Sequence, residues 1–157
     1  LSMPTHAEQK LLPYAPEKLF DVVADIGAYP EFLPWCVGAR VLRREDNVVY
    51  ADLIIGFKMV RETFTSKVTL NRPGRIDVEY QKGPFKHLKN HWEFKSHPEG
   101  CTIDFYIDFE FRSRLLRTLI EPLFHEAVRR MVAAFETRAK AIHGAPDAIP
   151  DSPRPVS

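Results

Sequence analysis

The sequence predicts an α+β fold in which a curved antiparallel sheet of about seven strands wraps around one long C-terminal helix, with two short helices after the first strand. Apolar residues recur every three or four positions over residues 115–143, which is typical of an amphipathic helix. Between residues 37 and 112 they recur at every second position, as in strands with one solvated face. An antiparallel sheet must cover its apolar face, and the only long apolar stripe in the sequence belongs to that helix.

Composition limits the possible classes of protein. The 157 residues fit one domain, which we expect to span residues 3–143 and to precede a disordered, proline-rich tail over residues 144–157. No run approaches 18 apolar residues, so no membrane-spanning helix is predicted. The net charge of +1 does not predict DNA as a partner. Cys36 and Cys101 have no C-x-x-C spacing and no secretion signal precedes them, which indicates a reducing compartment such as the cytoplasm.

The N-terminal part of the chain predicts one strand and two short helices. Residues 5–12 form a strand that ends at Pro13, which has no amide proton for a ladder. Pro16 suits a first helical turn and Glu17 suits the positive end of the helix dipole, so a short helix is expected up to about residue 26. Residues 29–36 contain too many prolines for a long helix and too many aromatic residues for a solvated loop. We expect them to form a second short helix packed onto the core.

The central region predicts an antiparallel meander. Its clearest strand covers residues 101–111, where apolar residues share one face and charged or polar residues share the other. Turn signals occur at residues 71–74, 83–84 and 98–100. The other predicted strands lie near residues 41, 49–57, 60–70, 76–81 and 87–94.

The C-terminal helix is predicted over residues 121–143, with Pro122 in its first turn, Gly144 as its stop signal, and residues 115–120 as a separate short turn. Its length is sufficient to cross the sheet of a small domain. The expected apolar face consists of Leu116, Ile120, Leu123, Ala127, Met131, Phe135, Ala139 and Ile142.

Several segments resemble those of a known family. Residues 19–25 (LFDVVAD) and 29–36 (YPEFLPWC) resemble the opening signature of the coenzyme-Q-binding Coq10 branch of START-type, or helix-grip, lipid-binding domains. The segments GPFKHL (83–88), WEF (92–94) and MVAAFETRA (131–139) extend the resemblance over roughly residues 3–143. Bacterial relatives described as ribosome-association toxins share the opening signature, and the wider superfamily includes polyketide cyclases.

The resemblance implies a protein that binds a prenylated quinone such as ubiquinone and supports respiratory electron transport as a carrier or chaperone, without being an enzyme. The prenyl lipid would be its ligand, and no catalytic cofactor is expected. The implied location is the cytoplasm, with peripheral contact to the inner membrane, or the matrix side of a mitochondrion in a eukaryote. Two alternatives remain open: a regulator that binds a ribosomal subunit, and a polyketide cyclase or dehydratase.

The same fold implies an apolar cavity between sheet and helix, lined by residues whose phase points inward. An inward apolar face equally suits a solid core, and the pattern does not separate the two. Among polar residues of this phase, Ser66 and Asn90 have donors for a quinone carbonyl, whereas ionised Glu62 has none. All three would alternatively bond neighbouring backbone, or a bulge would turn Glu62 to solvent. The apolar candidates are Phe57, Phe64, Tyr80, Trp92, Phe94, Phe105, Phe109, Phe124, Val128, Met131 and Phe135.

Motifs of metal and catalytic sites are absent from the sequence. His87 and His91 would lie about 13 Å apart on a strand and could not chelate one ion, and the other histidines are scattered. There is no H-E-x-x-H, G-x-S-x-G, P-loop or dinucleotide fingerprint. Since Glu62 is the only obvious inward carboxylate, the cyclase alternative depends on it.

Arginines form two local clusters, at residues 40–44 and 112–117. Such clusters usually only increase solubility. Beside an exposed loop at residues 57–59 or at Phe85, they would also suit anionic lipid headgroups or ribosomal RNA.

Overall fold

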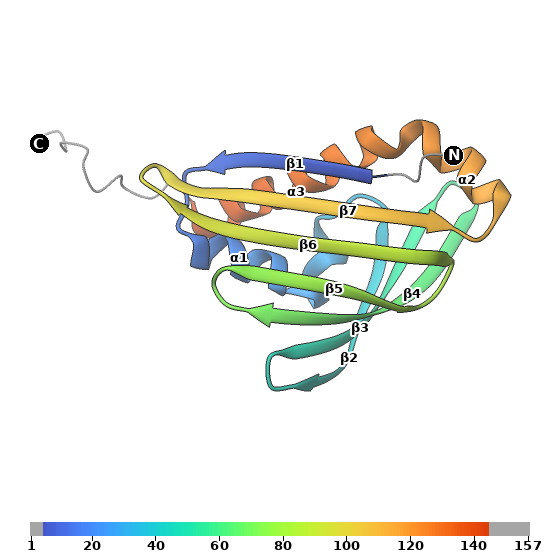
Figure 1. Cartoon of the computed structure of the whole chain (residues 1–157), viewed down its shortest axis with the longest axis horizontal. Helices are drawn as coiled ribbons and strands as arrows, with labels where there is room; N and C mark the ends of the chain where they lie inside the picture. The colour runs from blue at the N-terminus through green and yellow to red at the C-terminus, as the bar shows by residue number, and fades with distance from the viewer. Residues whose placement is uncertain (1–4, 145–157) are drawn as a thin grey trace, which may run out of the picture.

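The computed structural model describes residues 5–144, which form one seven-stranded antiparallel sheet (Figure 1). Its strand order is β1-β7-β6-β5-β4-β3-β2, so the first strand lies beside the last and β2 forms the opposite edge. This arrangement confirms the predicted sheet, while the predicted tail from residue 145 onward lies outside the described residues. The strands are β1 (Thr5–Leu12), β2 (Cys36–Glu45), β3 (Val48–Phe57), β4 (Val60–Asn71), β5 (Arg75–Lys82), β6 (Phe85–His97) and β7 (Gly100–Phe111).

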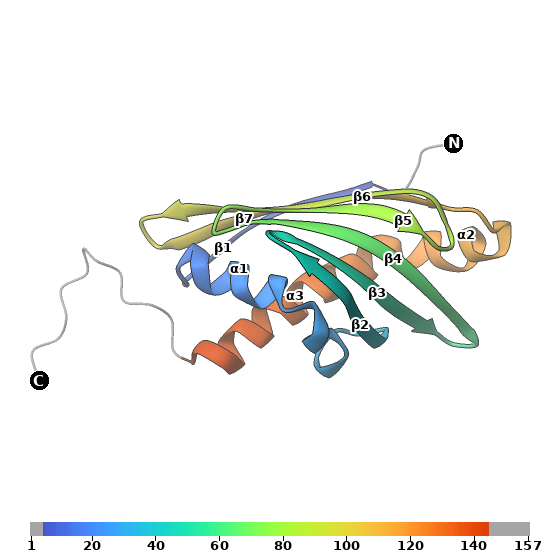
Figure 2. The same cartoon turned by 90° about the horizontal axis from the view of Figure 1, so that it is seen from below.

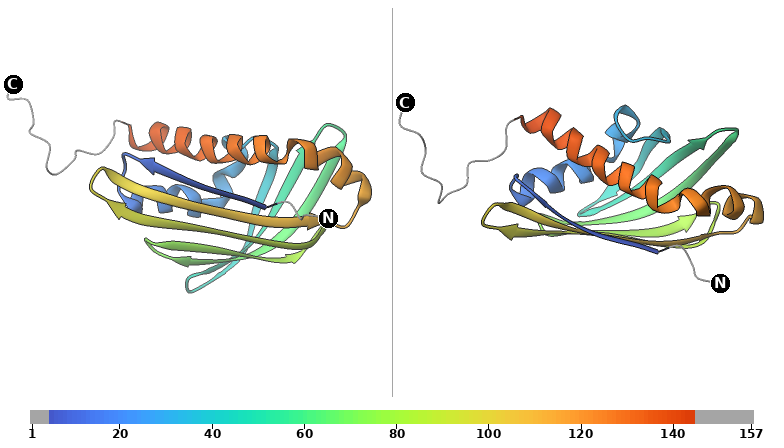
Figure 3. Two further views of the ribbon diagram at one scale, coloured as in Figure 1. Left: turned by 45° about the horizontal axis from the view of Figure 1, so that its top comes forward. Right: turned by 90° about the horizontal axis from the view of Figure 1, so that it is seen from above.

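Helices cover one face of the sheet. Helix α3 (Phe124–His143) crosses that face, with α1 (Pro16–Ala24) and the 3-10 helix η1 (Ile26–Glu31) beside it (Figures 2 and 3). The sheet arcs over these helices, which confirms the predicted curved sheet around a C-terminal helix. Within residues 5–144, no helix has the length and apolar character needed to cross a membrane.

Two details of the predicted C-terminal helix were wrong. The regular helix begins at Phe124 rather than at Glu121, because Pro122 lies in a 3-10 turn, η2 (Glu121–Leu123), that follows a separate helix α2 (Arg114–Ile120). The buried stripe is also rotated, since Leu123 and Ile142 are 44% and 50% exposed. The prediction assumed one continuous helical spacing of apolar residues, and the change of helix axis after α2 breaks that spacing. The buried residues of α3 are Phe124, Val128, Val132, Phe135 and Ala139.

The second short helix also differs from its prediction. It is the 3-10 helix η1, which begins three residues before the predicted residue 29 and ends well before residue 36. The segment packs onto the core as expected: the Tyr29 hydroxyl donates to the Val23 carbonyl, and the Tyr29 ring centroid lies 5.3 Å from that of Phe135. Burial raises the pKa of Tyr29, so its hydroxyl remains a donor.

Bulges bend the sheet around the helices. The strand register shifts within the β2–β3, β4–β5 and β6–β7 pairs. One shift falls between Thr65 and Ser66, and another between Phe85 and His87. An extra residue on one strand increases the local twist, so the sheet curves around α3 instead of packing flat against it.

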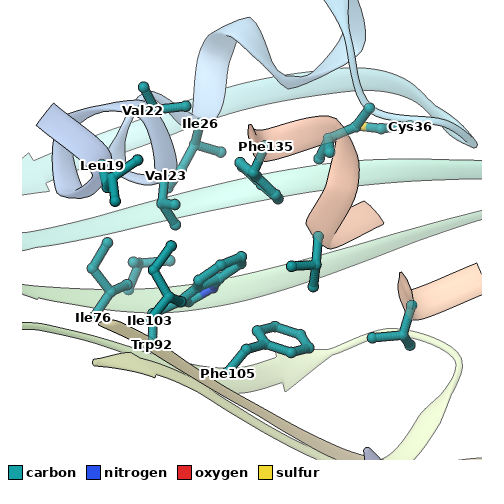
Figure 4. Packing of buried hydrophobic residues seen from close by; sticks show 14 of the residues in the cluster. Leu19, Val22, Val23, Ile26, Cys36, Ile76, Trp92, Ile103, Phe105 and Phe135 are labelled. Atoms are coloured by element: carbon teal, nitrogen blue, oxygen red, sulfur yellow. The ribbon is translucent and has the colours of Figure 1, made fainter. Parts of the chain in front are cut away.

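The core is solid at the end of the molecule where α1 packs. Figure 4 shows side chains of α1, the sheet and α3 meeting there. The rings of Phe20 and Phe94 lie 5.7 Å apart, and Cys101 is 0% exposed. Each such fully buried side chain contributes roughly 1.5–3 kcal/mol to folding. The larger space for a site lies toward the other end of α3, near Phe124 and Val128.

Candidate functional site

Two cavities lie between the sheet and the helices. The inner chamber has a volume of about 130 Å³ and is lined by α1, the 3-10 helix η1, strands β2 to β7 and α3. The outer chamber has a volume of about 380 Å³ and extends toward η2 and the start of α3. The combined space is of the size that small-molecule sites occupy. The two chambers are adjacent, since both are lined by Pro34, Ile55, Phe64, Leu88, Ile107 and Met131.

Most of the predicted candidate residues line these chambers, because alternate residues of each strand point toward α3. The inner chamber contains Phe64, Ser66, Asn90, Trp92, Phe105, Met131 and Phe135 in its wall. The outer chamber contains Phe57, Phe64, Phe109, Phe124, Val128 and Met131.

Three predicted residues line neither chamber. Phe94 belongs to the solid core, where it packs against Phe20. The hydroxyl of Tyr80 accepts a hydrogen bond from the Phe85 backbone at 3.1 Å, and its ring supports the Phe85 ring from outside the cavity. Glu62 is half-buried near the β3–β4 turn. Their inward phase was correct, but phase does not indicate where along a strand the void lies.

Ser66 is a buried polar group without a partner. Its side chain lines the inner chamber, the residue is 3% exposed, and its hydroxyl forms no hydrogen bond in the described structure. An unsatisfied buried hydroxyl costs about 1–3 kcal/mol. The backbone bond that was the alternative for this residue is therefore not formed. The hydroxyl is available to an acceptor that enters the chamber.

Asn90 instead forms a hydrogen bond to the backbone, which was the alternative prediction for this residue. Its side-chain Nδ2 donates to the Tyr106 carbonyl at 2.8 Å. An amide nitrogen has two hydrogens, so one remains for a second acceptor. The inner chamber thus presents a free hydroxyl and a partly used amide in a wall that is otherwise mainly apolar.

Charged side chains are few in the lining of the two chambers. Glu126 and Arg130 line the outer chamber and pair with each other at 3.1 Å. On the opposite face of the sheet, Lys95 lies 2.8 Å from Asp104 and lowers the pKa of that carboxyl. The chambers therefore favour an apolar ligand with few polar groups.

The thiol of Cys36 lines the inner chamber, and that of Cys101 lies in the solid core. Burial raises the pKa of both thiols, that of Cys101 to about 11. A raised pKa favours the neutral thiol, so at pH 8 both thiols should be protonated and unreactive. We expect native protein to resist a thiol-specific colorimetric reagent at pH 8 and both cysteines to react after denaturation in urea. Rapid reaction of either cysteine in the native protein would contradict this prediction.

Trp35 lines the outer chamber and was not among the predicted residues. Its ring centroid lies 6.4 Å from that of Phe57. The Trp35 backbone has a φ of 64°, in the left-handed region that bulky residues rarely adopt. This conformation orients the chain as it leaves the η1 segment for β2. No periodic signal marks such a residue in a sequence.

Two histidines that seemed scattered in the sequence meet in the structure. The Nδ1 atoms of His6 in β1 and His125 in α3 lie 3.0 Å apart, and His6 Nε2 lies 2.9 Å from Glu8 Oε1. Neither histidine lines a chamber, so the contact ties β1 to α3 and does not face a ligand. Within residues 5–144, no group of three or more His, Cys, Asp or Glu residues is arranged to hold a metal ion.

Comparisons with known proteins agree with this architecture. The sequence profile of a family described as "Polyketide cyclase / dehydrase and lipid transport" matches residues 12–136. The ribosome association toxin RatA of Rickettsia prowazekii is 42% identical over 137 residues, which cover 85% of this chain and 94% of that protein. The mitochondrial coenzyme Q-binding protein COQ10 homolog B of Xenopus laevis is 35% identical over 144 residues, 88% of this chain and 59% of the frog protein.

A solved structure confirms the predicted fold type. A START superfamily protein from Mycobacterium smegmatis superposes with a TM-score of 0.73 at 18% identity, over 89% of this chain and 98% of that one. At this identity the likeness shows the fold alone. The two sequence relatives are named for association and binding, not for a reaction.

Proposed function

This chain belongs to the polyketide cyclase, dehydrase and lipid transport family, and from that premise we propose that it binds a prenylated quinone such as ubiquinone, or a lipid of similar shape, in its two chambers. In this proposal the protein is a carrier or chaperone that supports respiratory electron transport. The name of the frog relative, which refers to coenzyme Q binding, supports the choice of ligand.

The observation that carries the proposal is the unpaired Ser66 hydroxyl inside an otherwise apolar chamber. A quinone ring has carbonyl oxygens that accept hydrogen bonds, so its head would occupy the inner chamber beside Ser66 and Asn90. The prenyl tail has no polar atoms and suits the outer chamber, where each buried methylene contributes about 0.8 kcal/mol. The ligand is thereby oriented with its head inward and its tail toward the entrance.

The position of Glu62 favours binding over the cyclase alternative. A cyclase or dehydratase needs an acid or base beside its substrate. Glu62, the carboxylate on which that alternative depended, lines neither chamber. The carboxylate that does line the outer chamber, Glu126, is exposed and paired with Arg130.

The proposal is tested first by native mass spectrometry and organic extraction of protein purified from a quinone-producing host. We expect a prenylquinone at near-stoichiometric occupancy. Protein that is empty and also fails to take up added quinone would overturn the proposal.

Replacing Ser66 by alanine should change stability and affinity in opposite directions. The free energy of unfolding of the ligand-free protein should rise by about 1 kcal/mol, because an unsatisfied buried hydroxyl is removed. Quinone affinity should fall about five- to tenfold through the loss of one hydrogen bond. Urea titration measures the change in stability, and quenching of the protein's fluorescence by added quinone measures the change in affinity. The matched control is Ser96→Ala on β6, which is exposed and should change neither quantity.

A second candidate function is association with a ribosomal subunit, which the name of the Rickettsia relative supports. Arg40 and Arg44 are exposed on the edge strand β2 and make no ion pair within residues 5–144. A basic edge of this kind suits RNA phosphates. If this candidate holds, the protein should sediment with ribosomal subunits and the Arg40→Glu, Arg44→Glu double variant should not. Competition by anionic vesicles distinguishes subunit binding from lipid binding.

A further inference from the structure

The antiparallel topology brings three separate segments to one end of the molecule. The β3–β4 turn, the β5–β6 turn and the exit of β7 into α2 all lie at the same end of the strands. Figure 1 shows the β5–β6 turn beside α2, and Figure 2 shows the β3–β4 turn at the same end. We call this end the mouth surface and define it by residues 57–62, 82–86 and 110–123.

Large apolar side chains point into solvent on the mouth surface. Met59, at the tip of the β3–β4 turn, is 97% exposed, and Leu115 on α2 is 64% exposed. Leu119 and Leu123 are 37% and 44% exposed. Scattered exposed leucines need no explanation, but here four large apolar residues gather at one end, where they favour a partner that covers them.

Positive charge surrounds these apolar groups. Seven lysines and arginines of the mouth surface stand against three glutamates, whereas the whole chain has a net charge of only +1. Glu110 pairs with Lys86 and Arg117, and the Arg112 guanidinium donates to the Phe85 carbonyl. Lys58, Arg61, Lys82 and Arg114 are all exposed and make no ion pair within residues 5–144.

The mouth surface is continuous with the cavity. Phe57 and Leu123, which belong to it, also line the outer chamber, and Leu123 reaches the solvent. The outer chamber therefore extends to the part of the mouth surface between the β3–β4 turn and η2, where the tail of the proposed ligand would leave it. The covering partner must accept this tail without exposing it to water.

We propose that the mouth surface docks on a membrane with anionic headgroups, with Met59 and Leu115 entering the headgroup layer and the unpaired cations contacting lipid phosphates. This inference rests on the proposed function, since it names the source from which the ligand enters. Apolar side chains between basic ones suit a lipid interface. An RNA surface would use the cations but leave the exposed leucines and Met59 in water.

The test is co-sedimentation of the full chain with vesicles of phosphatidylcholine alone or mixed with phosphatidylglycerol. Binding to the anionic vesicles is expected, weakening as salt is raised. Two double variants, Met59→Asp with Leu115→Asp and Lys58→Glu with Arg114→Glu, should each weaken vesicle binding at least about tenfold. The matched controls, Leu42→Asp and Lys89→Glu, replace exposed residues of the same types outside the mouth surface and should bind as the wild type does.

Several outcomes would overturn the docking proposal. One is that the wild-type protein stays in the supernatant when mixed with anionic vesicles. Another is that the double variants sediment with these vesicles as the wild type does. A loss of ribosomal-subunit binding in the same variants, without a change in vesicle binding, would assign the surface to the ribosome instead. Quinone binding in detergent solution should remain unchanged in every variant. Failure of the wild type in that assay overturns the proposed ligand, whereas failure with vesicles alone overturns only the docking.

Discussion

Replacing Ser66 by leucine should abolish quinone binding, with a loss of affinity of at least about a hundredfold, while the protein remains folded. The leucine side chain extends into the inner chamber of about 130 Å³ and removes both the space for the ring and the hydroxyl donor. Cavity filling by an apolar group typically raises stability by about 0.5–2 kcal/mol, so no unfolding is expected. Quinone titration in detergent and urea unfolding of the same preparation measure the two quantities.

The same substitution at Ser96, on the exposed part of β6, is the matched control and should leave quinone binding intact. Together with Ser66→Ala, the leucine variant separates the loss of a hydrogen bond from the loss of space. A folded Ser66→Leu protein with wild-type affinity would show that the quinone head does not occupy the inner chamber. The proposed orientation of the ligand would then be wrong.

Replacing Phe135 by alanine should lower the free energy of unfolding by about 3–5 kcal/mol, the usual cost of removing a large buried aromatic side chain. Phe135 is 6% exposed, and its ring centroid lies 5.0 Å from that of Trp92 and 5.4 Å from that of Phe32. It joins α3 both to the sheet and to the segment after η1. A loss of this size is a large part of the 5–15 kcal/mol that stabilise a typical domain. Urea denaturation of the ligand-free protein, followed by circular dichroism, provides the measurement.

Ile142→Ala is the control for this experiment, because it lies on the same helix and is 50% exposed. Surface substitutions of this kind change stability by less than about 0.5 kcal/mol. If the Phe135→Ala protein unfolded within 1 kcal/mol of the wild type, the described contact of α3 with the sheet would be incorrect. The described shape of the chambers, which depends on that contact, would then also be incorrect.

Local chemistry explains why the elements of the fold could be predicted. Side chains alternate across a strand, so the period of two over residues 37–112 indicated strands and their inward faces before any contact was known. Pro13, which cannot donate to a ladder, marks the end of β1 correctly. The start of α3 was misplaced because Pro122 is compatible both with the first turn of a long helix and with a separate 3-10 turn.

The candidate site could be predicted only in part. Ser66 and Trp92 were found because they share the inward phase of their strands, and both line the inner chamber. Phe94 shares that phase and lies instead in the solid core, since phase specifies a face and not a position along it. The pairing of His6 with His125 depends on how β1 meets α3, which no local pattern reports.

The sequence by itself determined the order of the elements, the face that each strand buries and the need for a helix to cover that face. Only the tertiary structure decided that the covered space is partly hollow, that Ser66 lacks a partner there, and that the unpaired cations surround Met59 and the exposed leucines. The physical reason is that burial of apolar surface is non-directional, so the same apolar face can fill a core or line a cavity. Bulges in the sheet and the break between α2 and α3 set the distance between the sheet and α3. That distance decides whether the apolar faces fill a core or line a cavity.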